Sequence, residues 1–391
     1  MVVVAIFGAS LASVACHKSG TAVRSTPQPG SANQPRAFFP IAAAWTLPLN
    51  SGLTTAPGYD SSRGYFPLDG NQLVAYDLTR GTRLWLVSTT TDTEPAAGDE
   101  LVFVLEHDVL TARRAADGSK VWAVPFAEKL TVPPVWDTGW LVAANASGTV
   151  FAFRAADGQL IWSRNVGSPL GSRPAPSGHR VFVATEDGRI VALDIQSGEI
   201  AWDRRLGGAG SDILALDERL FVGSRDNYMY CLRTDDGSRD WRVRTGADII
   251  GAPVVDEHNL YFVSLDNVLR ALNRGHGVQQ WIQGLSFRPT AGPVKADDTL
   301  IVNGIVPGLK GFSTKDGRPS GDQTTSGELA APLHFLSNPL TGTNELIVIT
   351  RDVLKGATVT ALRRSGDPAI APFAALPNAM RAPAAPPGSN P

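Results

Sequence analysis

The chain has 391 residues, of which 43% are hydrophobic and 18% charged, and its net charge is −2. A chain of this composition can bury a sizeable core, and a net charge so close to zero argues against binding to nucleic acid or to an anionic membrane surface. The 39 glycines and 28 prolines favour many short strands joined by turns over long helices.

The N-terminal residues 1–15 predict a signal peptide. Residues 2–15 are apolar or small. They are too few to span a bilayer, which takes roughly 20 helical residues, but they match the apolar region of a signal peptide. The stretch Ser13-Val14-Ala15-Cys16 resembles the lipobox of bacterial lipoproteins, which implies cleavage before Cys16 and lipidation of that residue. A plain secretory signal and a chance apolar N-terminus are the alternatives.

Two further segments are predicted to lie outside the folded domain. Residues 16–41 are polar and rich in serine, proline and glycine, which predicts a flexible tether. Residues 371–391 are rich in alanine and proline, which predicts a disordered tail. The folded domain is therefore expected over residues 42–370.

A repeat of about 40 residues is the strongest signal in this domain. Seven tryptophans recur at intervals of 37 to 40 residues: Trp45, Trp85, Trp122, Trp162, Trp202, Trp241 and Trp281. Each of them except Trp45 lies four residues after a glycine. Two more glycine turns, at Gly317 and Gly366, continue the series without a tryptophan, so the chain contains eight repeat units.

Each unit contains four short strands and no helical pattern. An alternating strand precedes each glycine, a second strand lies upstream across a tight turn such as Asp187-Gly188, and a short strand that usually begins near a proline comes first. The fourth strand carries the tryptophan. Four-stranded units repeated around an axis form a propeller, so the predicted fold is all-β, an eight-bladed β-propeller.

The two ends of the repeat series complement each other. The unit that ends at Gly366 lacks its fourth strand, whereas Trp45, in residues 42–47, lies on a fourth strand with no unit before it. We expect this N-terminal strand to complete the eighth blade, because pairing removes an exposed sheet edge.

The recurring tryptophans are predicted to be structural, with each ring at the outer edge packed against the next blade. Trp136 and Trp140 fall outside this register, in the turn at residues 136–140. They are candidates for exposed aromatic side chains that bind a ligand, and packing in the core is the alternative.

The segment Ala192-Leu193-Asp194-Ile195-Gln196-Ser197-Gly198-Glu199-Ile200-Ala201-Trp202 resembles the PQQ-type propeller repeat, and eight such copies cover residues 45–366. Among families with this repeat, the chain is most similar to the BamB family of outer-membrane β-barrel assembly lipoproteins. The grounds are the lipobox-like start, the length and the eight blades. The resemblance implies a monomeric periplasmic protein, tethered to the outer membrane by its lipid, that docks on the barrel-inserting subunit BamA.

That family carries a Leu-x-Leu-Arg stretch in the loop before one mid-propeller blade and an Asp-x-Asp pair before the next. The corresponding stretches here, residues 168–173 and 208–212, match neither pattern. The resemblance nevertheless implies Leu170, Arg173 and Asp212 as partner-binding residues, because such inter-blade loops lie on one face of the ring. Ordinary solvated loop side chains are the alternative.

Enzymes that share this repeat bind pyrroloquinoline quinone between a tryptophan and an adjacent pair of cysteines, with Ca²⁺ nearby. No such pair is present, because Cys16 lies in the leader and Cys231 takes a strand position that is alanine in other units, which favours a buried, inert thiol. The six histidines show no metal-ligand spacing, and no nucleophile elbow or zinc helix occurs. We therefore predict no catalytic residue, no cofactor and no metal.

Taken together, these patterns predict a non-catalytic scaffold that binds envelope proteins outside the cytoplasm. A propeller that binds a small ligand or a cell-wall polymer is the alternative, and a quinone-dependent dehydrogenase is a third, less favoured one. The fold class does not separate these functions, since one propeller architecture hosts many of them.

Overall fold

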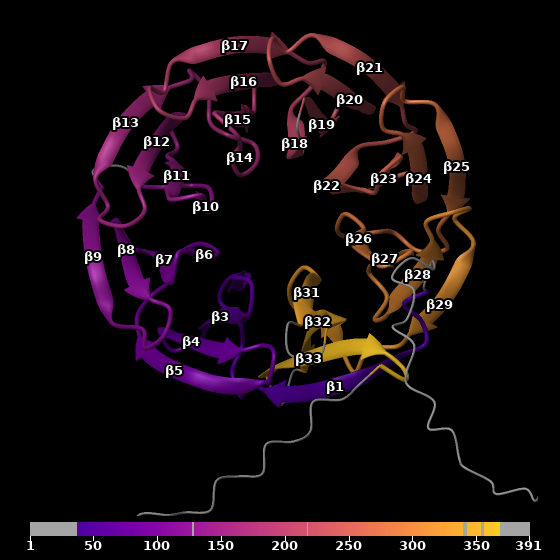
Figure 1. Ribbon diagram of the computed structural model, residues 1–391, viewed down its shortest axis with the longest axis horizontal. Coiled ribbons are helices and arrows are strands. Elements are labelled where there is room, and N and C mark those ends of the chain that lie inside the picture. The colour runs from indigo at the N-terminus through magenta and orange to yellow at the C-terminus, as the bar shows by residue number, and fades with distance from the viewer. Residues whose placement is uncertain (1–36, 127–128, 217, 339–341, 353–355, 368–391) are drawn as a thin grey trace, which may run out of the picture. The chain divides into compact units, whose positions relative to one another are not determined.

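Eight antiparallel blades form a ring in the computed structural model of the chain, with one strand of each blade at the rim (Figure 1). The structure describes residues 37–126, 129–216, 218–338, 342–352 and 356–367. The predicted signal peptide, most of the predicted tether and the predicted tail fall outside these ranges. Over the described ranges the regular elements are all strands, and no helix is long and apolar enough to cross a membrane. The prediction of an eight-bladed β-propeller is confirmed.

Blades 1 to 7 each consist of four consecutive strands, ordered from the centre to the rim. The innermost strands, in blade order, are β2 (Gly58–Tyr59), β6 (Ala96–Gly98), β10 (Val135–Asp137), β14 (Ala175–Ser177), β18 (Gly210–Leu216), β22 (Ile249–Val255) and β26 (Val294–Ala296). The second strands are β3 (Arg63–Leu68), β7 (Leu101–Glu106), β11 (Trp140–Ala144), β15 (Arg180–Ala184), β19 (Arg219–Ser224), β23 (Asn259–Ser264) and β27 (Thr299–Asn303). The third strands are β4 (Gln72–Asp77), β8 (Val109–Arg114), β12 (Thr149–Arg154), β16 (Arg189–Asp194), β20 (Tyr228–Arg233), β24 (Val268–Asn273) and β28 (Leu309–Ser313). The rim strands are β5 (Thr82–Ser88), β9 (Lys120–Pro125), β13 (Leu160–Asn165), β17 (Ile200–Arg205), β21 (Arg239–Arg244), β25 (Gln279–Gly284) and β29 (Pro319–Gln323).

The eighth blade combines the two ends of the domain. Its inner position is divided between β30 (Glu328–Leu329) and β31 (His334–Asn338), which both pair with β32 (Thr343–Asp352). Next comes β33 (Gly356–Arg364), and the rim strand is β1 (Ile41–Pro48), which pairs antiparallel to β33 with Trp45 opposite Ala361. The ring is therefore closed by the N-terminal strand, as predicted.

The connections between strands define two faces of the propeller. The loops between blades and the turns between second and third strands lie on one face, which we call the inter-blade face; residues 206–209 and 185–188 are examples. The turns between first and second strands, together with the glycine turns between third and fourth strands, lie on the other, which we call the glycine-turn face; residues 178–179 and 195–199 are examples.

Each tryptophan of the repeat packs on the glycine turn of the next blade. A β-carbon at any of seven turn glycines, Gly81 to Gly317, would lie only 2.5–2.8 Å from the tryptophan of the preceding blade. From Trp85 to Trp281, the indole Nε1 also donates a hydrogen bond of 2.7–3.2 Å to a backbone carbonyl of that same turn. Glycine is required because the turn has a φ near +70° and because the ring fills the space of a side chain. The predicted packing role of these tryptophans is confirmed.

Blade 7 has no tryptophan, and Phe39 fills the space that one would occupy. By strand register, Gly321 stands at the tryptophan position and pairs with Gly311, which stands where other blades carry alanine or cysteine. A β-carbon at either glycine would lie 2.5 Å from Phe39, whose side chain is 7% exposed. The aromatic ring is thus supplied by the N-terminal segment instead of by the blade itself.

The last residues of the segment predicted as a tether therefore pack on the propeller. Phe38 is fully buried among residues of blades 7 and 8, and its backbone N–H donates to Thr299 Oγ1 at 3.0 Å. Thr299 opens β27 directly after a turn of the glycine-turn face. The N-terminal segment consequently joins the domain on that face.

Replacing Phe39 with alanine is expected to lower the free energy of unfolding by about 3 kcal/mol, because it removes a buried aromatic ring from a site lined by glycines. Urea denaturation followed by tryptophan fluorescence measures the change. The control is Leu86→Ala, at a rim residue that is 43% exposed, which should change the stability by less than about 0.5 kcal/mol. Equal midpoints for the two variants would show that Phe39 does not hold the ring closed.

Candidate docking site

The two loops predicted to bind a partner both lie on the inter-blade face, before β14 and in β18. Leu170, however, is only 5% exposed and belongs to the core between blades 3 and 4. It forms a β-bridge with Thr185, which turns its side chain into the seam between the blades. Leu170 is therefore a packing residue, which corrects its predicted role as a contact residue.

Arg173 makes a bridge between two blades that are not neighbours. Its guanidinium donates two hydrogen bonds, of 3.1 and 2.8 Å, to the two carboxylate oxygens of Glu94. Glu94 precedes the innermost strand of blade 2 and Arg173 precedes that of blade 4, so the pair passes over blade 3 near the axis of the ring. Burial lowers the pKa of Arg173, but the bonds and charge of Glu94 and the charge of Asp212 outweigh this and raise it.

Arg173 and Asp212 are thus brought together with Glu94, a residue that sequence reasoning missed. The three occupy the same repeat position, directly before the proline of the innermost strand or, in blade 5, before Ile213 in its place. That shared position is the signal in the sequence that could have identified Glu94. On the inter-blade face the three side chains form a charged cluster, whose side-chain exposure is 46% at Arg173 and 22% at Glu94.

Trp136 and Trp140 do not form an exposed pair. Both rings are half-buried: Trp136 packs against Gly98 in the core between blades 2 and 3, and Trp140 packs in the core between blades 3 and 4. Blade 3 separates the two rings, because its opposite faces contact different neighbours. The expectation of two exposed aromatic side chains in one turn is wrong, and the alternative of core packing holds.

Tyr59 and His334 stack where blade 1 meets blade 8, on the innermost strands β2 and β31. Their ring centroids lie 3.8 Å apart with an interplanar angle of 6°. Burial lowers the pKa of His334 from 6.5 to about 4, so the imidazole is neutral at physiological pH. Burial, with a contribution from the charge of Glu94, raises the pKa of Tyr59, whose buried hydroxyl has no hydrogen-bond partner in the structure.

Cys231 is buried in β20, at the position occupied by alanine in most blades. Burial raises the pKa of its thiol to about 12, so the protonated and unreactive form prevails at neutral pH. The interpretation of Cys231 as an inert core residue agrees with this environment. Within the described ranges, no three His, Cys, Asp or Glu side chains are grouped so that they could hold a metal ion.

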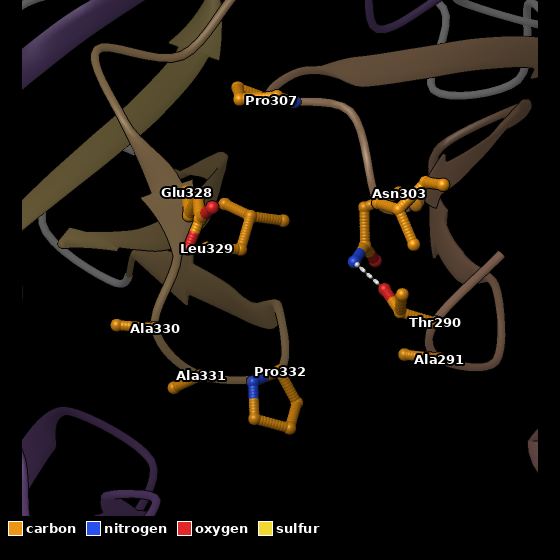
Figure 2. Close-up of a pocket in the computed structure, with 11 residues that line it drawn as sticks. Thr290, Ala291, Asn303, Pro307, Glu328, Leu329, Ala330, Ala331 and Pro332 are labelled. Atoms are coloured by element: carbon orange, nitrogen blue, oxygen red, sulfur yellow. Dashed lines mark hydrogen bonds between the residues drawn. The ribbon is translucent and has the colours of Figure 1, made fainter. Parts of the chain in front are cut away.

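A hollow of about 480 Å³ opens on the inter-blade face between blades 7 and 8 (Figure 2). Blade 7 contributes Thr290, Ala291 and the turn after Asn303, and blade 8 contributes residues 328–332. Asn303 and Thr290 form one wall, joined by a 2.9 Å hydrogen bond from Asn303 Nδ2 to Thr290 Oγ1, and Leu329 faces them from the other side. This hollow was not predicted from the sequence.

The turn between β27 and β28 protrudes beside this hollow with aliphatic side chains. Ile305 and Val306 are 66% and 62% exposed, more than any other large hydrophobic residue described. A second hollow of about 280 Å³ lies on the other side of the turn, lined by Phe287, Val306 and Lys310 among others. The inter-blade face of blade 7 therefore combines exposed aliphatic surface with concave surface, as interaction sites commonly do.

The comparisons with known proteins follow from this architecture. The family model described as "Outer membrane protein assembly factor BamB" matches residues 42–129, 106–216 and 204–339. The chain belongs to this family. Among curated proteins, no sequence matches the chain significantly.

Solved structures share the fold at low sequence identity. BamB from Moraxella catarrhalis superposes with a TM-score of 0.67 and 18% identity, covering 83% of this chain and 98% of that one. The quinohemoprotein alcohol dehydrogenase from Comamonas testosteroni gives 0.65 and 12%, with 83% and 76% covered. The C-terminal WD40 domain of Sif2 gives 0.67 and 11%, with 82% and 98% covered. At these identities the structural matches establish the propeller fold alone, and the BamB family assignment rests on the family model.

The buried stack of Tyr59 on His334 predicts a pH dependence of stability in this BamB-family propeller. The folded-state pKa near 4 lies below the ordinary 6.5, so the unfolded chain takes up a proton first as the pH falls. Stability is therefore retained above pH 6.5 and lost between 6.5 and 4, by roughly 2–3 kcal/mol at pH 4.5. His334→Phe should remove this part of the pH dependence.

Denaturant unfolding at pH 7.5 and 4.5 measures the effect. The matched control is His276→Gln, on an exposed glycine turn, which should leave the pH dependence as in the unmodified protein. If His334→Phe and the unmodified protein lose the same stability between the two pH values, the imidazole is not buried in its neutral form.

Proposed function

We propose that the chain is a non-catalytic scaffold that binds other proteins of the cell envelope, as a BamB-like lipoprotein of the outer-membrane β-barrel assembly machinery. The family match, which spans residues 42–339, is the observation that carries the proposal. The inter-blade face is the proposed docking surface for BamA, since it holds the loops that correspond to the docking loops of the family. Of the three predicted contacts, Arg173 and Asp212 remain candidates, together with Glu94.

The proposed attachment to the membrane is a lipid on Cys16, followed by a tether. Packing of Phe38 against blades 7 and 8 supports an orientation in which this tether joins the glycine-turn face. The inter-blade face lies on the opposite side of the ring, where it is accessible to a periplasmic partner. This arrangement places the protein on the periplasmic side of the outer membrane.

The proposal of a scaffold competes with a quinone-dependent enzyme, because a quinohemoprotein dehydrogenase shares the fold. Such enzymes need a cofactor pocket with specific ligands. The chain lacks an adjacent cysteine pair, and the thiol of Cys231 is buried with a raised pKa. Binding of a cell-wall polymer is not favoured by the half-buried Trp136 and Trp140, which face two different seams.

Docking through the inter-blade face predicts that a charge reversal there blocks capture of BamA. Asp212→Lys changes the charged cluster beside Arg173, and it should reduce crosslinking of the tagged protein to BamA in native membranes by about tenfold, as loss of one charged interfacial contact does. Mass spectrometry of the captured proteins gives the readout.

The matched control is Glu218→Lys, which makes the same change of charge in the same blade but on the glycine-turn face, where Glu218 is exposed. It should crosslink as the unmodified protein does. Absence of BamA from the unmodified sample would overturn the assembly role while leaving the propeller as a scaffold for another envelope complex.

Lipidation predicts that Cys16→Ser moves the protein from the membrane fraction to the soluble periplasmic fraction, because one chain-linked lipid is the proposed anchor. Fractionation with immunoblotting and metabolic labelling with a radioactive fatty acid measure this. Cys231→Ser, at the buried cysteine, is the control and should keep both the label and the membrane association. A Cys16→Ser protein that still pellets with membranes would contradict the anchor.

A further inference from the structure

One position in the second strand separates blade 7 from the other seven blades. In every blade it lies two residues beyond the residue that registers with the tryptophan row, on the inter-blade side. The eight residues at this position are Pro67, Leu105, Ala144, Ala184, Gly223, Val263, Asn303 and Ile349. Asn303 is the only polar one, and it is 6% exposed. A repeat that places small or apolar side chains in the seam thus carries a buried carboxamide where blade 7 faces blade 8.

The carboxamide of Asn303 is only partly satisfied. Nδ2 donates to Thr290 Oγ1 at 2.9 Å, whereas the buried Oδ1 accepts no hydrogen bond in the structure. Thr290 can serve only one end of the amide, so one end is left over whichever way the amide is placed. A buried polar atom without a partner is costly, and its presence where the repeat has apolar residues favours a role in binding.

The neighbouring turn departs from the repeat as well. In blades 3, 4 and 5 the residue after this position is polar and accepts backbone N–H groups of its own turn: Asn145, Thr185 and Ser224. Blade 7 has Gly304 there, followed by the exposed Ile305 and Val306. A self-capped polar turn is thus replaced by one that presents aliphatic side chains to solvent beside the hollow.

The lining of the hollow indicates what could fill it. Besides Asn303 and Thr290 it is formed by small or aliphatic residues such as Ala291, Leu329 and Ala330, and none of its lining residues is aromatic. It therefore offers no ring on which a sugar could stack. Its charged residue, Glu328, has a side chain that is 70% exposed and pairs with Arg351 at 3.3 Å, so the charge lies at the edge.

We propose that the seam between blades 7 and 8 binds an extended peptide segment of a partner protein. A carboxamide has the same N–H donor and C=O acceptor as a peptide group, so Asn303 can pair with the backbone of such a segment in both directions. The adjoining aliphatic surface of Ile305, Val306 and Leu329 accommodates an aliphatic side chain of the peptide. This goes beyond docking on BamA and does not depend on it, since the site lies on different blades from Arg173 and Asp212.

The proposal can be tested by methyl NMR of the full chain with labelled Ile, Leu, Val and Ala side chains. The probe is the capped pentapeptide acetyl-Ser-Val-Leu-Val-Ser-amide, and its control is acetyl-Ser-Gly-Ser-Gly-Ser-amide. We expect the first peptide, but not the second, to shift the methyl signals of Ile305, Val306 and Ala330 in a saturable way. Shifts confined to rim residues such as Leu86 or Ile282 would overturn the site.

Asn303→Val separates binding from folding, because it gives blade 7 a residue like the one that blade 6 carries at this position. It should keep or raise the melting temperature and weaken peptide binding about tenfold, as expected for loss of the hydrogen bonds of one amide. Ile305→Ser, on the exposed turn, should weaken binding without changing the melting temperature, and Ile200→Ser, on the rim of blade 4, should change neither.

Two further results would overturn the proposal. A lower melting temperature of Asn303→Val with unchanged peptide affinity would make Asn303 a structural residue. Shifts of the same methyl signals on deletion of residues 368–391, with no shift on adding the peptide to the full chain, would show that the tail of the chain itself occupies the seam.

Discussion

The contact of each tryptophan with the glycine turn of the next blade is the interaction on which the ring depends. An indole ring buries a large apolar area, and its N–H forms a hydrogen bond with a carbonyl of the turn, so the contact is both apolar and directional. Because the partner is always the next blade, one local pattern repeated along the chain sets the spacing between blades. Glycine follows from the same contact, since the ring takes up the volume of any side chain there.

The weak point of such a ring is the place where the repeat fails. Blade 7 has glycine at both positions of the tryptophan row that would otherwise carry side chains, and the volume is filled by Phe39 from the N-terminal segment. The same segment continues into β1, which completes the eighth blade. Closure of the ring and compensation for the degenerate blade are thus performed by one stretch of chain. The part of the N-terminal segment next to β1 is a structural element of the propeller.

The two faces of the ring have different chemistry. The glycine-turn face is made of short, self-capped turns, and it receives the N-terminal segment. The inter-blade face carries the charged cluster of Glu94, Arg173 and Asp212 near the axis, and the exposed aliphatic turn at Ile305 and Val306 farther along the ring. These features lie on blades whose repeat pattern is altered locally, which is where a scaffold can acquire specific contacts without disturbing the packing between blades.

The sequence by itself determined the number of blades, the four strands in each, the role of the tryptophans and the closure by the N-terminal strand. These features rest on a spacing of glycine and tryptophan that is repeated locally, so they can be read from the order of residues. Only the tertiary structure decided that Leu170 is buried, that Trp136 and Trp140 face different seams, that Arg173 reaches Glu94 across blade 3, and that a hollow lies beside Asn303. Each of these depends on which side chains of separate blades meet, and no periodicity encodes such pairings because the residues involved break the repeat.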